Sequence, residues 1–419
     1  MNADDAREQA RALDARLARG EDIGPLAGIP LGVKDLEDAA GFVTTYGSAL
    51  HVSDAPAEED SVLVARLRAA GCVIIGKTNT PEFGFKGQTD NPSFGATANP
   101  WNEAFSAGGS SGGAGSALAS GMVPLATGSD GGGSIRIPSA VCGLSGMKTS
   151  QGRVPNGGHA PPGSGLLTVK GPMAIRIRDV VTALDAVVGE HPTDIFSLPA
   201  PEQPWRPQLD DAPLPERVIW SPTLGFANMD REIAALCQTA VDRLEAAGTE
   251  VIRLDDIWSE DPVGSWFTLW AAYRGRAQGD VRGTADWERI DPALRFQIEF
   301  GLDRLTAVDF ARAVDAAHGL NLALERAFER APLIITPATS GHTPRLGHDG
   351  TVNGEETQAW VTFTYGLNLT RNPAGVISVD RTREGMPVSL QIVGRQRDDL
   401  RVLRALAATE DLFGTALAG

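Results

Sequence analysis

The stretch Gly128-Ser129-Asp130-Gly131-Gly132-Gly133-Ser134-Ile135-Arg136-Ile137-Pro138 is the most informative part of this 419-residue chain. It places consecutive backbone N–H groups, free of bulky side chains, directly before the hydroxyl of Ser134. Glycine lets a backbone turn tightly and approach a ligand closely, and successive N–H groups in such a turn form an anion-binding concavity. The run is typical of an oxyanion hole beside its own nucleophile. A flexible Gly/Ser loop is the equally open alternative, because glycine-rich motifs are common.

A second glycine-serine segment, Gly108-Gly109-Ser110-Ser111-Gly112-Gly113, lies upstream of the first. Alone it is typical of a flexible linker. However, small helix-compatible residues follow it at 114–119, and an apolar stretch at 122–126 then leads to the second glycine run. Both segments therefore lie at junctions between elements. The spacing leaves room for a helix and a strand that bring Ser110 and Ser134 together.

The rest of the chain alternates helical patterns with short apolar runs, which favours an α/β fold. Residues 58–70 predict a helix that ends at Gly71, and residues 72–75 predict a buried strand. Residues 191–217 are rich in proline and predict a surface excursion. Further helices are expected over 3–18, 230–247 and 307–331, and further strands over 28–33, 251–254, 333–336, 376–379 and 388–393.

Composition excludes several classes of protein. The net charge is −16, with 53 acidic against 37 basic residues, which argues against nucleic acid as a partner. The N-terminus lacks the basic start and apolar stretch of a signal peptide, and no 18-residue apolar run is present, so we expect a cytoplasmic protein without membrane association. The three cysteines are scattered and are expected to be reduced.

Two further patterns suggest functions that we consider improbable. Residues Gly71–Thr78 match the phosphate-loop pattern GxxxxGK[ST], but the middle of the match is a predicted strand and Pro81 follows soon after. His342, His348 and Asp349 lie in a Gly/Pro-rich loop, where histidines are more often solvated than metal-bound. We therefore expect neither a metal nor an organic cofactor.

Several motifs in the same order resemble those of the amidase signature family. They are GIPLGVKD at 28–35, GKTNTPEF at 76–83, NPWN at 99–102, GGSSGG at 108–113, the Ser134 run, GMKTSQGR at 146–153 and MPVSLQIVG at 386–394. The match is dense over 24–156, which we take as the signature core, and returns near 365–415. It is weak over 190–330, which we interpret as a variable, substrate-shaping region. The resemblance implies a single large α/β domain over 1–419, with a mixed central β-sheet covered by helices on both faces.

The resemblance also implies a Ser-Ser-Lys relay, in which Ser134 is the nucleophile, Ser110 the proton bridge and Lys34 the base. In the family the peptide bond before the bridging serine is cis. Lys34 must then be held neutral by burial and by hydroxyl groups, and the neighbouring Leu31, Gly32 and Val33 are consistent with burial. The oxyanion hole is expected from the N–H groups of Gly131, Gly132, Gly133 and Ser134, with Ser111, Asp130 and Arg136 as supports.

Aromatic residues are candidates for the substrate pocket. Trp266, Trp270 and Tyr273 fall on one face of a predicted helix; a core stripe is the first interpretation, and a pocket wall formed by Trp266 and Trp270 is the alternative. Phe83 and Phe85 come just after a strand, and pocket and core are equally open for them.

The expected reaction is hydrolysis of an amide-type C–N bond in a small molecule. The motif form resembles hydrolases of aryl amides and nylon-type oligomers, and carbamates or aryl esters could follow the same acyl-enzyme route. The alternative is the amidase (glutaminase) subunit of a tRNA-dependent amidotransferase, which would need partner subunits. A homodimer is a further expectation for the assembly.

Overall fold

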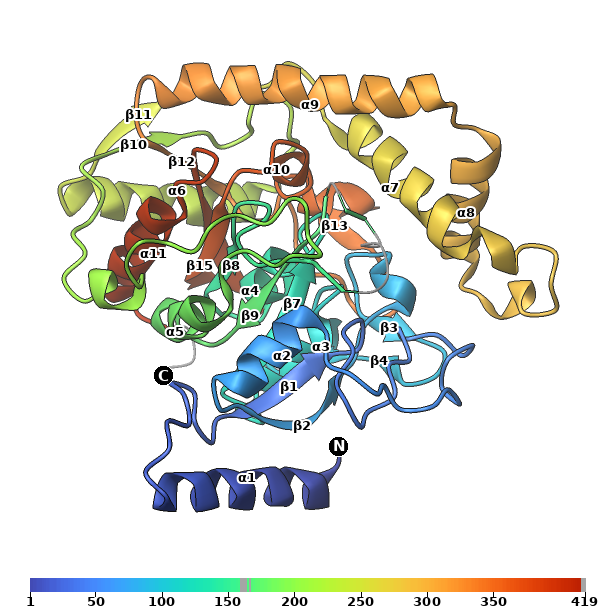
Figure 1. Ribbon diagram of the computed structural model, residues 1–419. Coiled ribbons are helices and arrows are strands. Elements are labelled where there is room, and N and C mark those ends of the chain that lie inside the picture. Colours follow the sequence, from blue (N-terminus) through green and yellow to red (C-terminus); the bar gives the residue numbers. More distant parts are fainter. Residues whose placement is uncertain (159–163, 166, 416–419) are drawn as a thin grey trace.

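Two mixed β-sheets form the centre of the protein in the computed structural model, which describes residues 1–158, 164–165 and 167–415 (Figure 1). The first sheet contains β1 (Pro30–Lys34), β2 (Val73–Thr78), β7 (Leu125–Asp130) and β9 (Val169–Met173), in the order β2-β1-β7-β9. The second contains β8 (Gly146–Lys148), β10 (Arg217–Trp220), β11 (Glu250–Arg253), β12 (Leu333–Pro337), β15 (Ala374–Arg381) and β16 (Pro387–Gly394), in the order β11-β10-β12-β16-β15-β8. The edge strands β8 and β9 contact each other.

The first sheet brings Lys34 close to the glycine-rich loop that follows β7. Strand β1 runs parallel to both β2 and β7, whereas β9 is antiparallel to β7. Lys34 is the last residue of β1 and Asp130 the last of β7. Because the carboxyl ends of neighbouring parallel strands open at the same edge of a sheet, the loop after β7 starts beside Lys34.

Helices cover both faces of the sheets. On one side lie α2 (Val62–Ala69), α5 (Ile177–Val187), α6 (Arg231–Ala246) and α11 (Asp399–Phe413), whose apolar faces share one core with the sheets. On the other lie α3 (Gly112–Ala119) and α4 (Arg136–Val141). Two neighbouring residues of strand β15 point to opposite faces of the second sheet. Ile377 packs in the large core, and Val376 packs against Ala140 of α4. The predicted α/β class with helices on both faces is therefore confirmed, and the strands of the predicted mixed sheet are divided between two mixed sheets.

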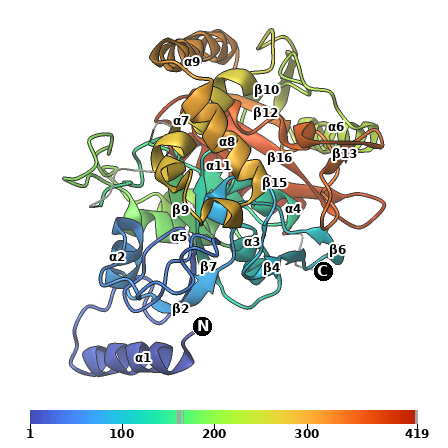
Figure 2. The same ribbon diagram turned by 90° about the vertical axis from the view of Figure 1, so that its right-hand side faces the viewer.

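Three long helices form a separate layer at the top and right of Figure 1: α7 (Val263–Gln278), α8 (Pro292–Asp303) and α9 (Ala307–Phe328). Figure 2 shows α7 and α8 side by side below α9, and α7 contacts both of the others. This layer belongs to the stretch where the sequence resemblance is weakest.

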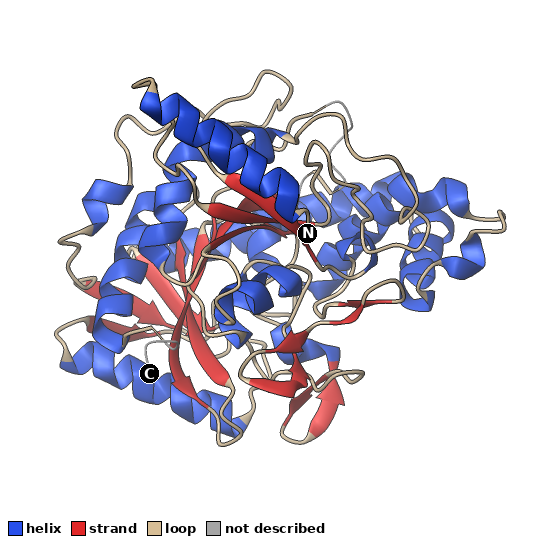
Figure 3. Cartoon of the chain, turned by 90° about the horizontal axis from the view of Figure 1, so that it is seen from below, coloured by secondary structure: helices blue, strands red, loops and turns tan. Residues whose placement is uncertain are grey.

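Helix α1 (Ala3–Ala18) lies apart from the body and has no buried residue. Seen from below, it crosses in front of the first sheet (Figure 3). The Asn2 N–H donates to Ile75 O at 3.1 Å, and the Gln9 side chain bonds the backbone of Ile74. Since β2 is an edge strand, this helix covers an edge that would otherwise be open.

Short elements complete the described chain. They are the strands β3 (Asp90–Asn91), β4 (Gly95–Ala96), β5 (Ala98–Asn99), β6 (Asn102–Ser106), β13 (Gly350–Val352) and β14 (Glu355–Thr357), the helix α10 (Gly366–Leu369), and the 3-10 helices η1 (Glu82–Gly84), η2 (Arg206–Leu209), η3 (Gly279–Val281), η4 (Trp287–Arg289) and η5 (Gln358–Val361).

The structure contradicts the phosphate-loop pattern. Gly76, Lys77 and Thr78 continue strand β2, so the phosphate-loop match has no loop followed by a helix. His342 pairs with Asp230 at 3.1 Å, and the described residues contain no group of three or more candidate ligands arranged for a metal ion. No helix in the described part of the chain has the length and apolar character needed to cross a bilayer.

Candidate active site

Lys34 is fully buried at the end of β1, among hydroxyl groups. Its Nζ lies 2.8 Å from Ser110 Oγ, 2.8 Å from Ser111 Oγ and 3.0 Å from Ser129 Oγ. Burial lowers the pKa of Lys34 to about 7, although the negative charges of Glu37 and Asp130 act in the opposite direction. Asp35 faces elsewhere, because it bonds Thr45 and lies 3.4 Å from Lys77 Nζ. A large share of Lys34 is therefore neutral at neutral pH.

A neutral lysine has two N–H donors and one lone pair, and three hydroxyls surround it here. Ser111 Oγ also lies 3.4 Å from Ser129 O, an acceptor to which its own proton can point. Ser110 Oγ makes no other hydrogen bond within the described residues, so its proton can point to the Lys34 lone pair. This pattern leaves Ser111 and Ser129 to accept the two lysine protons.

Ser110 and Ser134 lie in the wall of one cavity, as the sequence predicts for two relay members. The peptide bond between Gly109 and Ser110 is cis, in agreement with the resemblance. The two serine segments are joined directly, because the Ser111 N–H donates to Ser134 O at 3.3 Å. Ser134 itself is half-buried, at the start of the turn that leads into α4.

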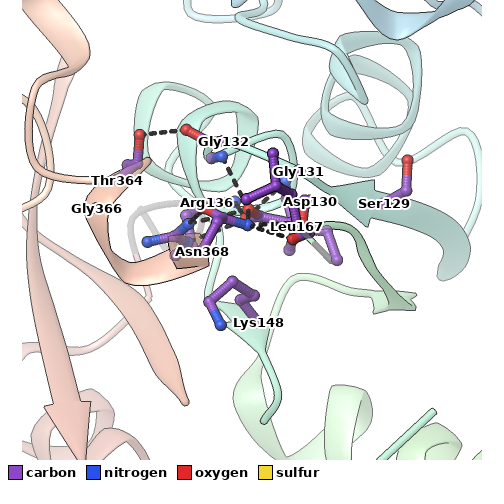
Figure 4. A network of polar contacts seen from close by, with 12 residues as sticks. Ser129, Asp130, Gly131, Gly132, Arg136, Lys148, Leu167, Thr364, Gly366 and Asn368 are labelled. Carbon is purple, nitrogen blue, oxygen red and sulfur yellow. Dashed lines mark hydrogen bonds and ion pairs between the residues drawn. The ribbon is translucent and has the colours of Figure 1, made fainter. Parts of the chain in front are cut away.

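Asp130 and Arg136 form a fully buried ion pair beneath the glycine loop (Figure 4). Arg136 Nη2 and Nε lie 2.9 Å from the two carboxylate oxygens of Asp130. Burial alone would raise the pKa of Asp130, but the charge and hydrogen bonds of Arg136, the charge of Lys148 and the hydrogen bond from Asn368 together outweigh it and hold the pKa well below its ordinary value. The carboxylate therefore stays ionised and accepts further hydrogen bonds from the loop.

One of those hydrogen bonds corrects the predicted oxyanion hole. The Gly133 N–H donates to Asp130 Oδ1 at 2.8 Å, so it is not free to bind an oxyanion. Gly133 also has a φ of 131°, a conformation that side chains rarely adopt. Its role is to turn the loop back onto Asp130. The N–H groups of Gly131, Gly132 and Ser134 have no acceptor within the described residues and remain as candidate donors.

Residues from the C-terminal third of the chain also hold this loop. Asn368 donates to Asp130 O at 2.8 Å and accepts from Arg136, which also donates to Gln391 Oε1 at 2.8 Å. Thr364 Oγ1 donates to Gly132 O at 2.6 Å (Figure 4). Sequence reasoning did not assign a role to these residues or to Ser129, although Ser129 and Gln391 lie inside family motifs and Thr364 and Asn368 do not.

The cavity beside Ser134 has a volume of about 940 Å³ and is bounded by α7, η1, residues 156–158, and Ser164, Thr168 and Lys170. Trp270 and Phe83 lie in its wall. Trp266 stacks on Trp270 with ring centroids 5.2 Å apart, and its Nε1–H donates to Gly131 O at 2.8 Å. A Cβ on Gly131 would lie 2.7 Å from the Trp270 ring. The two tryptophans therefore contact Gly131 of the glycine loop, rather than forming only a core stripe.

Phe85 lies in the core and not in the cavity wall, so of the two interpretations left open for it the core is correct. It is 4% exposed and packs with Ile290, Leu294 and Ile298. The short helix η1 turns between Phe83 and Phe85, and this separates a residue of the cavity wall from a residue of the core. Spacing alone could not distinguish them.

Comparison with known proteins agrees with this geometry. A family model described as "Amidase" matches residues 1–403. An acylamidase of Rhodococcus erythropolis is 36% identical over 96% of this chain and 86% of its own length. The crystal structure of a bacterial aryl acylamidase of the amidase signature family superposes with a TM-score of 0.90 at 29% identity, covering 98% of this chain and 87% of that one. A glutamyl-tRNA(Gln) amidotransferase subunit of Roseiflexus castenholzii is 32% identical over 96% of this chain and 86% of its own.

The chain belongs to the amidase signature family.

Proposed function

We propose that the protein hydrolyses the C–N bond of small, non-peptide amides through an acyl-enzyme on Ser134. The observation that carries the proposal is the buried Lys34, whose Nζ lies 2.8 Å from Ser110 Oγ in the wall of the cavity that also contains Ser134. A serine hydroxyl is a weak nucleophile and needs a base. A lysine with a pKa of about 7 can serve as that base near neutral pH.

The first half of the reaction forms the acyl-enzyme. Ser134 Oγ attacks the amide carbonyl while its proton passes to Ser110 and the Ser110 proton passes to Lys34. The developing oxyanion accepts hydrogen bonds from backbone N–H groups of Gly131, Gly132 and Ser134; each such donor is worth on the order of 100-fold in rate. The C–N bond then breaks, and the proton returns through Ser110 to the leaving nitrogen, which departs as a neutral amine.

The second half reverses the proton path. Water takes the place of the amine and gives its proton through Ser110 to Lys34 as it attacks the acyl-enzyme. The ester bond to Ser134 then breaks, and the proton returns to Ser134 Oγ. The same route would cleave carbamates and aryl esters, since an aryl ester differs from an amide only in its leaving group and a carbamate differs in the substituent on the carbonyl carbon.

The similarity to the amidotransferase subunit favours a second candidate, release of ammonia from an amide for use by a partner protein. Two results separate the candidates. A stand-alone amidase turns over small amides as the isolated chain, whereas an amidotransferase subunit needs partner subunits and co-purifies with them.

The direct test is release of p-nitroaniline from short-chain anilides by the purified chain, with matched carbamates and p-nitrophenyl esters in parallel. Ser134→Ala and Lys34→Ala should abolish turnover, whereas Ser120→Ala, a change at an exposed serine after α3, should leave it intact. Activity that survives in Ser134→Ala would refute the assignment of the nucleophile. A covalent label from a serine-reactive probe should appear on Ser134 and be absent from Ser134→Ala.

A further inference from the structure

Arg274 on α7 is a buried cation in the wall of the active-site cavity. It is 6% exposed and lines the same cavity as Ser110 and Ser134. Its guanidinium lies 4.4 Å from the centre of the Trp270 ring, and Trp270 in turn packs against the backbone of Gly131. Arg274 is therefore only one side chain away from the loop that carries the nucleophile.

The charge of Arg274 has no carboxylate partner. Its Nη1 donates to Phe83 O and its Nη2 to Ser164 Oγ, each at 3.0 Å, and both acceptors are neutral. No carboxylate of the described chain lies within ion-pair distance, and the remaining residues, 159–163, 166 and 416–419, include no Asp or Glu. Among the described residues, Arg274 Nε is buried without an acceptor. Gln278 Oε1, one turn further along the same cavity wall, is buried without a donor there.

The buried and half-buried charged groups of the cavity wall other than Arg274 have compensating partners, whereas Asp38 and Glu59 are exposed to solvent. Glu37 pairs with Lys170 at 2.8 Å, and Asp60 pairs with Arg68 at 2.6 Å. Arg66 is half-buried and donates to carbonyl oxygens of residues 187–190, at the C-terminal end of α5, where the helix dipole favours a cation. An unpaired charge in the interior is costly. Burial and the nearby charge of Arg276 lower the pKa of Arg274 only to about 10, so it remains charged at neutral pH.

We propose that Arg274 binds a carboxylate of the substrate, so that the preferred amides carry an anionic group near the scissile bond. A guanidinium has five N–H donors, of which Arg274 uses two within the described residues. Its planar fork matches a carboxylate and forms strong charge-assisted hydrogen bonds. The inference rests on the proposed amidase function, and it identifies the substrate class of that same site.

The test compares anionic amides with neutral amides of nearly the same shape. For a carboxylate on the acyl side, succinyl-p-nitroanilide is paired with 4-oxopentanoyl-p-nitroanilide, in which a methyl group replaces one carboxylate oxygen. For a carboxylate on the leaving group, 4-acetamidobenzoate is paired with 4-acetamidoacetophenone. The variants are Arg274→Gln and Arg274→Lys, and Arg276→Gln removes an exposed charge from the same helix as the control. The readout is kcat/KM for each substrate, and the pair with the larger difference shows where the carboxylate lies.

Wild type should prefer the anionic member of one pair. Arg274→Gln should lower kcat/KM for that substrate by about 10- to 100-fold, the range expected for a hydrogen bond to a charged group, and change the neutral member by less than about threefold. Arg274→Lys should retain part of the preference, and Arg276→Gln all of it. Equal losses for both members of the pair would overturn the proposal, because that result indicates only that Arg274 supports the positions of Phe83 and Ser164.

A binding measurement keeps this test independent of turnover. Calorimetry on Ser134→Ala should detect tighter binding of the anionic member, and Arg274→Gln in that background should remove the difference. Equal binding of both members would overturn the role of Arg274 even if anilides are hydrolysed. Conversely, a clear binding preference without any hydrolysis would refute the proposed function and support the carboxylate site.

Discussion

The pH dependence of turnover should report on Lys34, because only its neutral form can accept a proton. With a pKa of about 7, its neutral fraction changes from roughly one tenth at pH 6 to roughly nine tenths at pH 8. We therefore expect kcat/KM to rise by about tenfold over that interval and to be flat between pH 8 and 9. A lysine with the ordinary pKa of about 10.4 would give a further tenfold rise between pH 8 and 9.

Two substitutions assign that pKa to Lys34. The charge of Glu37 raises the pKa of Lys34, so Glu37→Gln should move the acid limb of the profile to lower pH. Lys148 is also buried with its pKa lowered to about 7, and it serves as the control. The charge of Asp399 raises the pKa of Lys148 but does not contribute to that of Lys34, so Asp399→Asn should leave the limb in place.

The assay is initial-rate hydrolysis of an anilide under conditions where its concentration is far below KM, in buffers of constant ionic strength. A profile that still rises tenfold per pH unit above pH 8 would refute the neutral-lysine mechanism. So would a limb that moves with Asp399→Asn and not with Glu37→Gln.

Three further predictions concern the loop and the pocket. Asp130→Asn leaves the charge of Arg136 unpaired, so urea unfolding should show a loss of about 3–5 kcal/mol of stability, and activity should fall as well. An unchanged unfolding midpoint would contradict a stabilising role for the Asp130–Arg136 ion pair. Trp266→Phe removes the hydrogen bond to Gly131 O and should lower kcat more than it raises KM, which steady-state kinetics can check. Phe85→Ala should lower the free energy of unfolding by about 3–5 kcal/mol, while KM measured well below the melting temperature stays unchanged. Phe83→Ala should change KM with a smaller loss of stability, because Phe83 lies in the cavity wall.

The local parts of the site could be predicted because short motifs encode them. Both glycine-serine segments are predicted at junctions of elements, and Ser110 and Ser134 do lie at such junctions in one cavity. The predicted helices 3–18 and 230–247 agree within a residue or two with α1 and α6, since apolar spacing and the N-cap Asp230 mark their ends.

The remainder depends on tertiary structure. Asn368 lies in a pattern that locally suggests only a glycosylation sequon, and nothing near it indicates its contacts with Asp130 and Arg136. The direction of the Gly133 N–H follows from its backbone dihedral angles, which a run of three glycines does not specify. The sequence predicts one mixed sheet, because a list of strands does not show which strands pair. The structure divides these strands between two sheets.

The contact between Arg136 and Gln391 joins residues 255 positions apart. On the ribosome, Lys34, Ser110 and Ser134 all leave the exit tunnel long before Gln391 is made. At about 5–20 residues per second, synthesis of the 255 residues that separate Arg136 from Gln391 takes roughly 13–50 s. Throughout it the nascent chain carries every relay residue but lacks the strand and helix that support the nucleophile loop. A chain truncated before residue 364 is therefore expected to keep Lys34, Ser110 and Ser134 while lacking Thr364, Asn368 and Gln391, the side chains that hold the glycine loop.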